Sequence, residues 1–268
     1  MLQLASHRIA YRESTGTGSP GFLFVHGNSS SSRSFECLLA SELGQSHRMV
    51  AIDLPGHGNS DPAADPARTY NMPGYARMLL EAADALGMKD AIFVGWSLGG
   101  HIVLETAPHL PDAKGFVIFG TPPIAFPPAM EAAFLPNPNV NSGFAQELTE
   151  EQMRAYVEAF FKPGMPDVPE TFMEDIRKTH GLARSIMGAS IGPDGYADEV
   201  EIVGKLKQPL MVIHGAQEQL INGDYFDSIK MPTLWGDAVQ IIADAGHAPH
   251  WETPDKFEEL LADFAADL

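Results

Sequence analysis

The chain of 268 residues is poor in cysteine and in basic side chains. Cys37 is the only cysteine, which excludes an internal disulfide framework and is compatible with a reducing compartment. Seventeen basic residues stand against 35 acidic ones, and the formal net charge of -18 repels both nucleic acid phosphates and anionic lipid. We therefore expect neither nucleic acid nor a membrane as a partner, but a small molecule.

Long apolar segments are also missing. Every apolar run is far shorter than the ~20 residues that a membrane-spanning helix needs. Residues 1–13 alternate apolar and polar side chains, without the basic start and continuous apolar stretch of a signal peptide. These features predict a cytoplasmic protein, whereas no pattern indicates its oligomeric state.

The motifs that bind metals or phosphates have no counterpart in the chain. There is no dense cluster of the HxHxDH type, and a proline interrupts the pair formed by His247 and His250. Neither GxxxxGK[ST] nor GxGxxG follows an apolar, strand-like segment. We therefore predict an activity that uses no metal and no cofactor.

Short apolar segments alternate with helical patterns along most of the chain. Residues 73–86 place apolar side chains on one helical face, with Pro73 near the start and Gly87 at the end. Such alternation is typical of a mostly parallel sheet flanked by helices. We predict an α/β fold with eight strands, in which two edge segments precede six buried ones, at residues 2–5, 8–12, 22–25, 49–52, 91–94, 116–119, 210–213 and 239–242.

The alternation stops after residue 119, and the next convincing strand begins near residue 208. The segment between these two residues is too long for a loop, and its sequence contains helical signals of its own. Thr149 and Gln152 form a capping-box pattern that opens a segment through Phe161, and a second segment runs from 170 to about 190. We predict a core domain of residues 1–121 and 206–268 with a helical cap of residues 122–205. A few of its large apolar side chains are expected to line a pocket and most to pack against the core: Phe126, Met130, Phe134, Phe144, Tyr156, Phe160, Phe161, Phe172, Met173 and Met187.

Ser97 lies in the sequence GWSLGG, directly after a predicted strand and before a helical pattern. This is GxSxG in the setting where it forms a sharp turn that exposes the serine hydroxyl. The backbone N–H of Leu98, at the start of the helix, points to the same place and can stabilise an oxyanion. A second donor is expected from the N–H of Asn28, which follows another predicted strand. His26, just before that turn, is expected to be a hydrogen-bonded scaffold residue.

A serine nucleophile needs a general base and an acid that orients the base. His247 follows the last predicted strand in AGHAP, at the same edge of the sheet as Ser97, and is our candidate base, with His250 as its rival. The acid of this arrangement lies between the serine and the histidine in the chain. Glu218 stands in the loop after the strand at 210–213, and Asp224 is the alternative.

Together these motifs resemble the α/β-hydrolases over nearly the whole chain. The segments HGNSSS, DLPGHG, GWSLGGH, GTPP and AGHAP resemble, more narrowly, the serine-dependent N-acyl-homoserine lactonases of the AidH type. This resemblance implies an α/β-hydrolase fold and the opening of the lactone ring of quorum-sensing signals. It also implies that Asn28 and Leu98 form the oxyanion hole, that Trp96 borders the acyl pocket and that Tyr156 hydrogen-bonds the lactone. His250 departs from a commonly apolar position and is expected to titrate near His247 and shift the pH profile.

The function predicted from these features is serine-dependent cleavage of an ester or lactone through Ser97, His247 and Glu218, with N-acyl-homoserine lactones as the expected substrates and quorum quenching as the role. A general carboxylesterase, a perhydrolase and a C–C bond hydrolase share the same triad and remain alternatives. A ligand receptor that keeps the hydrolase shell is the non-enzymatic alternative. Epoxide hydrolases and dehalogenases are disfavoured, because their nucleophile at this turn is an aspartate.

Overall fold

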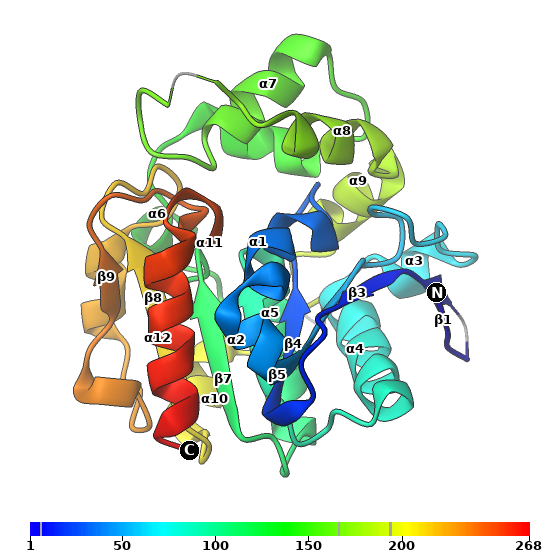
Figure 1. Ribbon diagram of the computed structural model, residues 1–268. Coiled ribbons are helices and arrows are strands. Elements are labelled where there is room, and N and C mark those ends of the chain that lie inside the picture. Colours follow the sequence, from blue (N-terminus) through cyan, green and yellow to red (C-terminus); the bar gives the residue numbers. More distant parts are fainter. Residues whose placement is uncertain (6, 166, 193–194) are drawn as a thin grey trace.

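The computed structural model describes residues 1–5, 7–165, 167–192 and 195–268 (Figure 1). Over these ranges the central sheet has seven strands in the order β3-β5-β4-β6-β7-β8-β9. All neighbouring strands run parallel, except that β3 is antiparallel to β5. The strands are β3 (Tyr11–Glu13), β4 (Gly18–Val25), β5 (His47–Ile52), β6 (Ile92–Trp96), β7 (Gly115–Phe119), β8 (Leu210–Gly215) and β9 (Gln240–Ile242).

All six buried strands expected from the apolar segments are present, but the sheet has one strand fewer than the eight predicted. Strands β1 (Leu2–Gln3) and β2 (Arg8–Ile9) pair only with each other, in a separate two-stranded sheet. Ala10 separates β2 from β3, because its N–H donates to Oγ of Ser60 at 2.8 Å and its carbonyl oxygen accepts the N–H of Asp53 at 2.9 Å. Both backbone groups of Ala10 are therefore used by a loop instead of a neighbouring strand.

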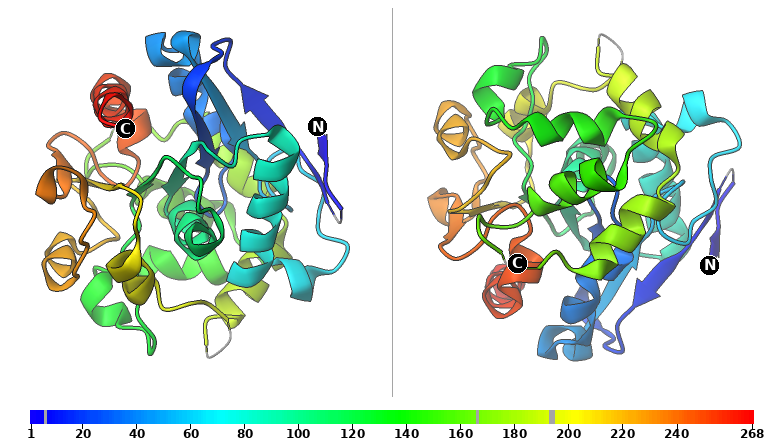
Figure 2. Two further views of the ribbon diagram at one scale, coloured as in Figure 1. Left: turned by 90° about the horizontal axis from the view of Figure 1, so that it is seen from below. Right: turned by 90° about the horizontal axis from the view of Figure 1, so that it is seen from above.

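Helices cover both faces of the sheet (Figures 1 and 2). Helices α1, α2 and α12 lie on one face, whereas α4, α5 and α10 lie on the other. This explains why β6 and β7 are buried along their whole length and consist almost entirely of apolar residues. The helices of this part are α1 (Glu36–Ala40), α2 (Glu42–Ser46), α3 (Pro66–Thr69), α4 (Met72–Leu86), α5 (Leu98–Thr106), α10 (Glu199–Lys205), α11 (Pro249–Glu252) and α12 (Pro254–Ala266), with the short 3-10 helices η1 (Ser32–Phe35), η2 (Ala107–His109), η4 (Gly223–Ser228) and η5 (Trp235–Asp237).

A second group of helices lies over the edge of the sheet where the parallel strands end (Figure 1). It consists of α6 (Met130–Ala133), η3 (Pro138–Phe144), α7 (Glu150–Glu158), α8 (Glu170–Lys178) and α9 (Gly181–Ala189). The capping box at Thr149 and Gln152 is present and opens α7. Helix α10, which also belongs to the segment 122–205, packs against α5. The division into a core and a cap at these boundaries stays a prediction.

The segment expected to be helical from residue 170 to about 190 is two helices. The chain breaks at Thr179 and His180, whose ψ angles of 126° and 116° are extended. The N–H of His180 donates to the carbonyl oxygen of Gly56 at 2.8 Å, so a loop of the core ends α8 at this point. The break lets α9 turn back across the top of the sheet.

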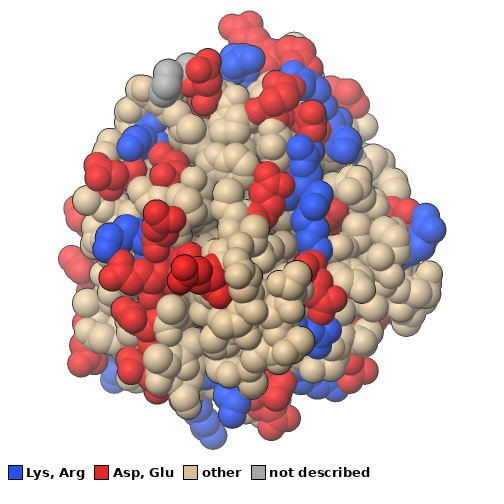
Figure 3. Space-filling view, in the orientation of Figure 1, with Lys and Arg blue, Asp and Glu red and all other residues tan. Residues whose placement is uncertain are grey.

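The surface reflects the acidic composition. Acidic side chains are spread over the face shown in Figure 3, among fewer basic ones. None of the helices in the described part of the chain has the length and apolar character needed to cross a membrane.

Candidate active site

Ser97 lies in the turn between β6 and α5, at the carboxyl edge of the sheet. Its φ and ψ angles of 53° and -119° are rare for a residue with a side chain, and such strain persists where the surroundings enforce it. The turn needs Gly99, because a Cβ atom there would lie 2.1 Å from the carbonyl oxygen of Val25. The N–H of Ser97 donates to the carbonyl oxygen of Phe119 at 2.9 Å. The backbone therefore holds the Ser97 side chain at the rim of the sheet.

His247 and Glu218 form a buried pair beside this turn. Nδ1 of His247 lies 2.8 Å from Oε2 of Glu218, and each side chain is only 2% exposed. The other oxygen of Glu218 accepts the backbone N–H groups of Gln219 and Leu220 at 2.9 and 2.8 Å. Because Glu218 acts as an acceptor toward both backbone groups, we assign Nδ1 of His247 as the donor of the shared bond. Its Nε2 then has a free lone pair, as a general base requires.

Asp224, the alternative acid, does not take part in this pair. It lies in η4 with an exposed side chain, and the carboxylate that contacts His247 is that of Glu218.

Two features of the fold position the imidazole of His247. Gly120 has a φ of 58°, and a Cβ atom at this residue would lie 2.7 Å from Cε1 of His247, so only glycine leaves room for the ring. On the other side, Nε1 of Trp96 donates to the carbonyl oxygen of His247 at 2.8 Å. Both contacts restrict where the ring can lie.

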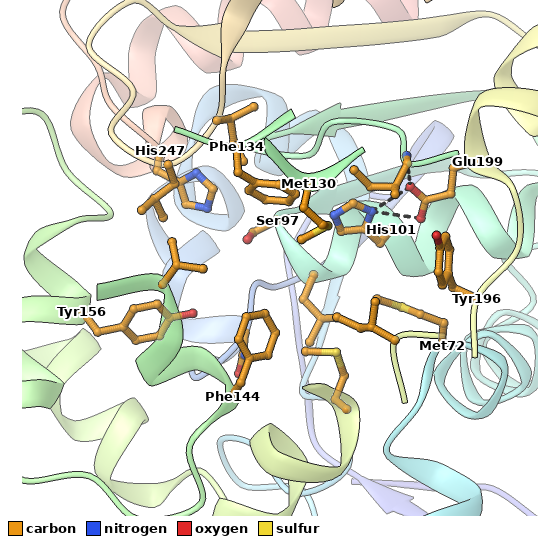
Figure 4. Close-up of a pocket in the computed structure, with 18 residues that line it drawn as sticks. Met72, Ser97, His101, Met130, Phe134, Phe144, Tyr156, Tyr196, Glu199 and His247 are labelled. Atoms are coloured by element: carbon orange, nitrogen blue, oxygen red, sulfur yellow. Dashed lines mark hydrogen bonds and ion pairs between the residues drawn. The ribbon is translucent and has the colours of Figure 1, made fainter. Parts of the chain in front are cut away.

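Ser97 and His247 line one pocket together with Asn28, Leu98 and Tyr156. Figure 4 shows the hydroxyl of Ser97 and the ring of His247 facing the same space. No hydrogen bond joins the two side chains in the described ranges. In free enzymes such contacts are often long and tighten when substrate binds. The structure thus brings together five of the seven residues singled out from the sequence, with Glu218 directly behind His247.

Among the described residues, neither the N–H of Asn28 nor that of Leu98 donates a hydrogen bond, so both can bind an oxyanion. Leu98 is the first residue of α5, so its N–H has no partner inside the helix. The side chain of Asn28 is fixed by two hydrogen bonds: its Nδ2 donates to the carbonyl oxygen of Gly143 at 2.7 Å, and Ser29 donates to its Oδ1 at 3.1 Å. The first of these bonds connects the loop after β4 to η3.

Tyr156 comes from α7 and reaches the pocket beside Gly143. A Cβ atom at Gly143 would lie 2.6 Å from the hydroxyl oxygen of Tyr156 and 3.2 Å from Nδ2 of Asn28, so the two polar groups lie near each other. Burial raises the pKa of Tyr156 well above its usual value, and the hydroxyl therefore stays protonated. It can donate a hydrogen bond to a bound molecule.

Most of the remaining pocket wall is apolar. The pocket holds about 840 Å³ of space, a part of which is open solvent. Five of the ten large apolar side chains named from the cap sequence line it, namely Met130, Phe134, Phe144, Tyr156 and Met187. Further lining comes from Met72, Ile124, Val140, Ile191, Leu220 and Ile221. A hydrocarbon chain would fit such a wall.

Trp96 does not border the pocket, contrary to what the resemblance implied. Its side chain is fully buried and lies beneath the site, in ring contacts with Phe160, Phe172, His247 and His250. The residue is part of β6, which is buried along its whole length, so the indole packs inside the protein. It contacts the site through the ring of His247 and through the hydrogen bond to the carbonyl oxygen of His247.

His250 is also buried and is not a titrating neighbour of the site. Its ring lies among Phe35, Trp96, Phe119 and Phe257, and neither ring nitrogen has a hydrogen-bond partner in the part of the chain that the structure describes. Burial, and to a smaller extent the charge of His247, lower the pKa of His250 well below its usual value. The expectation that it titrates and shifts the pH profile is therefore wrong.

His26 has the scaffold role expected from its position. The N–H of Leu54 donates to Nε2 of His26 at 3.0 Å, and Nδ1 lies 2.7 Å from the carbonyl oxygen of Gly27. Both ring nitrogens are thus used by the backbone, and burial lowers the pKa of this histidine.

His101 and Glu199 also line the pocket, and the sequence reasoning missed them. Nδ1 of His101 lies 2.9 and 2.8 Å from the two carboxylate oxygens of Glu199. A usable signal for His101 was its place in the first turns of the helix that directly follows Ser97. No local pattern pointed to Glu199, which begins α10.

Comparisons with known proteins agree with this geometry. The family model described as Alpha/beta hydrolase family matches residues 22–260. A crystal structure of a mutant of the N-acyl homoserine lactonase AidH, complexed with N-hexanoyl homoserine lactone, superposes with a TM-score of 0.93 at 36% sequence identity. The match covers 99% of this chain and 96% of that chain.

Two curated relatives are more distant. The 2-hydroxy-6-oxononadienedioate/2-hydroxy-6-oxononatrienedioate hydrolase of Paraburkholderia phymatum is 23% identical over 96% of this chain and 90% of its own length. The dihydrolipoyllysine-residue acetyltransferase component of the acetoin cleaving system of Cupriavidus necator is 25% identical over 95% of this chain, which spans 65% of that relative's length. The family match and the structural likeness agree, and the chain belongs to the alpha/beta hydrolase family.

Proposed function

We propose that the protein is a serine hydrolase that opens the lactone ring of N-acyl-homoserine lactones, and so quenches quorum-sensing signals. The observation that carries the proposal is the buried pair of His247 and Glu218 facing the pocket at Ser97. The likeness at 36% identity to a lactonase complexed with such a compound supports the choice of substrate.

In the first step, Nε2 of His247 takes the hydroxyl proton of Ser97 while Oγ attacks the lactone carbonyl carbon. The negative oxygen of the tetrahedral intermediate accepts hydrogen bonds from the N–H groups of Asn28 and Leu98. The ring C–O bond then breaks, and His247 gives its proton to the leaving alkoxide. The product of this step is an acyl-enzyme that carries a free hydroxyl on its acyl part. Glu218 holds the imidazole in the required tautomer and stabilises its charged form.

In the second step, water attacks the ester carbon of the acyl-enzyme. His247 accepts a proton from this water and returns it to Oγ of Ser97 as the bond to the serine breaks. The released N-acyl-homoserine carries a carboxylate. The hydroxyl of the acyl-enzyme is tethered and could close the ring again, so rapid entry of water is needed for net hydrolysis.

The pocket wall supports the same substrate. Its apolar side chains would surround the acyl chain, while the hydroxyl of Tyr156 would donate to an oxygen of the lactone. Tyr156 lies near Asn28 and therefore close to the proposed oxyanion hole. The cytoplasm as the location stays a prediction, supported by the single cysteine.

The distant likeness to a hydroxy-oxononadienedioate hydrolase makes C–C bond hydrolysis the second candidate, because it would use the same three residues. General carboxylester hydrolysis and perhydrolysis belong to the same group of alternatives. A ligand receptor is disfavoured, since binding alone would not need an oriented histidine beside a serine.

The test compares the wild type with Ser97→Ala on N-acyl-homoserine lactones of four to twelve acyl carbons, with the ring-opened product measured by mass spectrometry. We expect the wild type to open the lactones. The rate with the variant should exceed the rate in water by no more than about 10³- to 10⁴-fold, which is what binding and the oxyanion hole contribute. A p-nitrophenyl ester serves as the control substrate. Cleavage of the ester without opening of any lactone would reject the lactonase and leave a carboxylesterase.

A further inference from the structure

Two histidines, His247 and His101, line the pocket on either side of Ser97, and each is paired with a glutamate (Figure 4). The first pair is His247 with Glu218. The second is His101 with Glu199, in which Nδ1 lies 2.9 and 2.8 Å from the carboxylate oxygens. The mechanism proposed above uses only the first pair, so the second needs an explanation of its own.

The side chain of Glu199 is buried and held by hydrogen bonds. Its side chain is 2% exposed, and its Oε2 also accepts the backbone N–H of Ile124 at 2.8 Å. Oε2 of Glu199 acts as an acceptor toward Ile124, and the shared bond is accordingly assigned with Nδ1 of His101 as the donor. The ring is therefore fixed in one orientation.

This orientation leaves Nε2 of His101 for the pocket. Figure 4 shows this nitrogen directed away from Glu199, toward the side where Ser97 lies. Within the ranges that the structure describes, Nε2 makes no hydrogen bond. The side chain of His101 keeps 14% of its surface exposed, in contrast to His250, which is fully enclosed by aromatic rings.

The position of His101 relates it to the acyl part of a substrate. It lies in the first turns of α5, the helix that begins directly after Ser97, and it lines the same pocket as Ser97. The wall around it is apolar, with Met72, Met130 and Ile191 among its neighbours in the pocket. A plain hydrocarbon chain would cover the polar nitrogen without offering it a partner, which is unfavourable.

The charges nearby decide which kind of partner fits. The carboxylate of Glu199 places negative charge at this end of the pocket, and Glu105, which lies near it outside the pocket wall, adds only a partial charge at neutral pH, because burial raises its pKa to about 7. The region therefore disfavours a carboxylate at the end of an acyl chain. The described residues hold no group of three or more histidine, cysteine, aspartate and glutamate side chains suited to a metal ion. A neutral hydroxyl group of the substrate is the partner that remains.

We propose that Nε2 of His101, positioned by Glu199, forms a hydrogen bond with a hydroxyl group on the acyl chain, so that the enzyme selects hydroxylated acyl chains over unsubstituted ones. This inference rests on the proposed lactonase function for its choice of probes. His101 is then a specificity-determining residue, and Glu199 is a positioning residue.

The test uses N-(3-hydroxyoctanoyl)- and N-octanoyl-homoserine lactone with the wild type, His101→Asn and Tyr196→Phe. An asparagine amide can still donate to Glu199 but has no group in the place of Nε2. Tyr196 is the matched control, because it also lines the pocket but its hydroxyl already donates to the carbonyl oxygen of Ala125 at 2.9 Å. The double variant His101→Leu/Glu199→Gln replaces His101→Asn if the latter folds poorly, since it leaves no buried unpaired charge.

We expect the wild type to prefer the hydroxylated lactone about tenfold in kcat/KM, as one hydrogen bond allows. This ratio should fall to about one in His101→Asn and persist in Tyr196→Phe. A ratio that is the same in the wild type and His101→Asn overturns the inference.

Binding separates the inference from the proposed function. The affinities of both lactones for Ser97→Ala, with and without His101→Asn, are measured by calorimetry. If the wild type opens neither lactone but Ser97→Ala binds the hydroxylated one more tightly through His101, the lactonase is rejected and the inference holds. Equal affinities, or no binding of either compound, overturn the inference as well.

Discussion

Nε1 of Trp96 donates a hydrogen bond to the backbone carbonyl oxygen of His247 at 2.8 Å. Trp96 directly precedes Ser97, and His247 is 151 residues further along the chain than Trp96. One hydrogen bond therefore joins the turn of the proposed nucleophile to the segment of the proposed base. Both side chains are buried, so water does not compete for this bond.

Trp96→Phe removes the indole donor and leaves the carbonyl oxygen of His247 without it. An unsatisfied buried acceptor costs about 1–3 kcal/mol, and we expect the free energy of unfolding to fall by that amount. Since His247 would be held less firmly, kcat on a p-nitrophenyl ester should fall about tenfold. Urea denaturation and steady-state kinetics measure the two effects.

Trp235→Phe is the matched control for this variant. Nε1 of Trp235 donates to Oδ2 of Asp267 at 2.9 Å, in an exposed hydrogen bond that involves neither the turn at Ser97 nor His247. Its loss should change stability by no more than about 0.5 kcal/mol, as is usual at the surface. An unchanged kcat in Trp96→Phe would contradict the positioning of His247 by Trp96.

Glu218→Gln tests the acid of the proposed triad. The amide can donate to Nδ1 of His247, which would favour the wrong tautomer and place the proton on Nε2. We expect kcat to fall by about 10³- to 10⁴-fold with little change in KM. Glu218→Asp keeps the charge and should lose less, because the ring keeps its tautomer.

Asp224→Asn provides the control for the acid. The side chain of Asp224 is exposed, and kcat should stay within about twofold of the wild type. A large loss in Asp224→Asn together with an active Glu218→Gln would transfer the role of the acid to Asp224.

His250→Leu tests the buried, unpartnered imidazole. Burial lowers the pKa of His250 well below 6.5, so below pH 6.5 the unfolded chain takes up a proton that the folded protein does not. The free energy of unfolding of the wild type therefore falls as the pH falls. The substitution His250→Leu removes this dependence on pH. We expect the gain in unfolding free energy to be about 2 kcal/mol larger at pH 5 than at pH 8.

The pH dependence of kcat gives a second measurement on His250→Leu. Because His250 stays neutral over the working range, the profile of the variant should coincide with that of the wild type. A shifted profile would show that His250 titrates in the folded protein.

Glu105→Gln tests the carboxyl whose pKa burial raises to about 7. Between pH 4.5 and 7 the folded protein binds more protons at this residue than the unfolded chain, so its contribution to stability is lost as the pH rises through 7. The amide oxygen can still accept the N–H of Ala197, which Glu105 binds at 2.6 Å. We expect Glu105→Gln to raise the unfolding free energy by about 1–3 kcal/mol at pH 8 and to change it little at pH 5. The same gain at both pH values would show that Glu105 does not titrate in this range.

The turn residues could be recognised from the sequence because their signal is local. The glycines around Ser97 are required by contacts inside one strand-turn-helix unit, and a capping box at Thr149 needs only residues three apart. The position of His247 followed from its place after the last strand, because parallel strands end at one edge of the sheet.

Other features depended on distant contacts and were missed or misjudged. The break at His180 arises from a bond to Gly56, and the separate sheet of β1 and β2 arises from the bonds of Ala10 to a loop. The burial of Trp96 and His250 depends on rings that come from several parts of the chain.

By itself, the sequence determined the succession of strands and helices, the strained turn at Ser97 and the order in which His247 and Glu218 follow it. Each of these depends on backbone geometry over a few residues and on the common edge of a parallel sheet. Only the tertiary structure decided which other polar groups share the pocket. His101 and Glu199 are 98 residues apart and meet because α10 packs against α5. Such a contact is decided by how whole helices pack, which no local spacing of residues encodes.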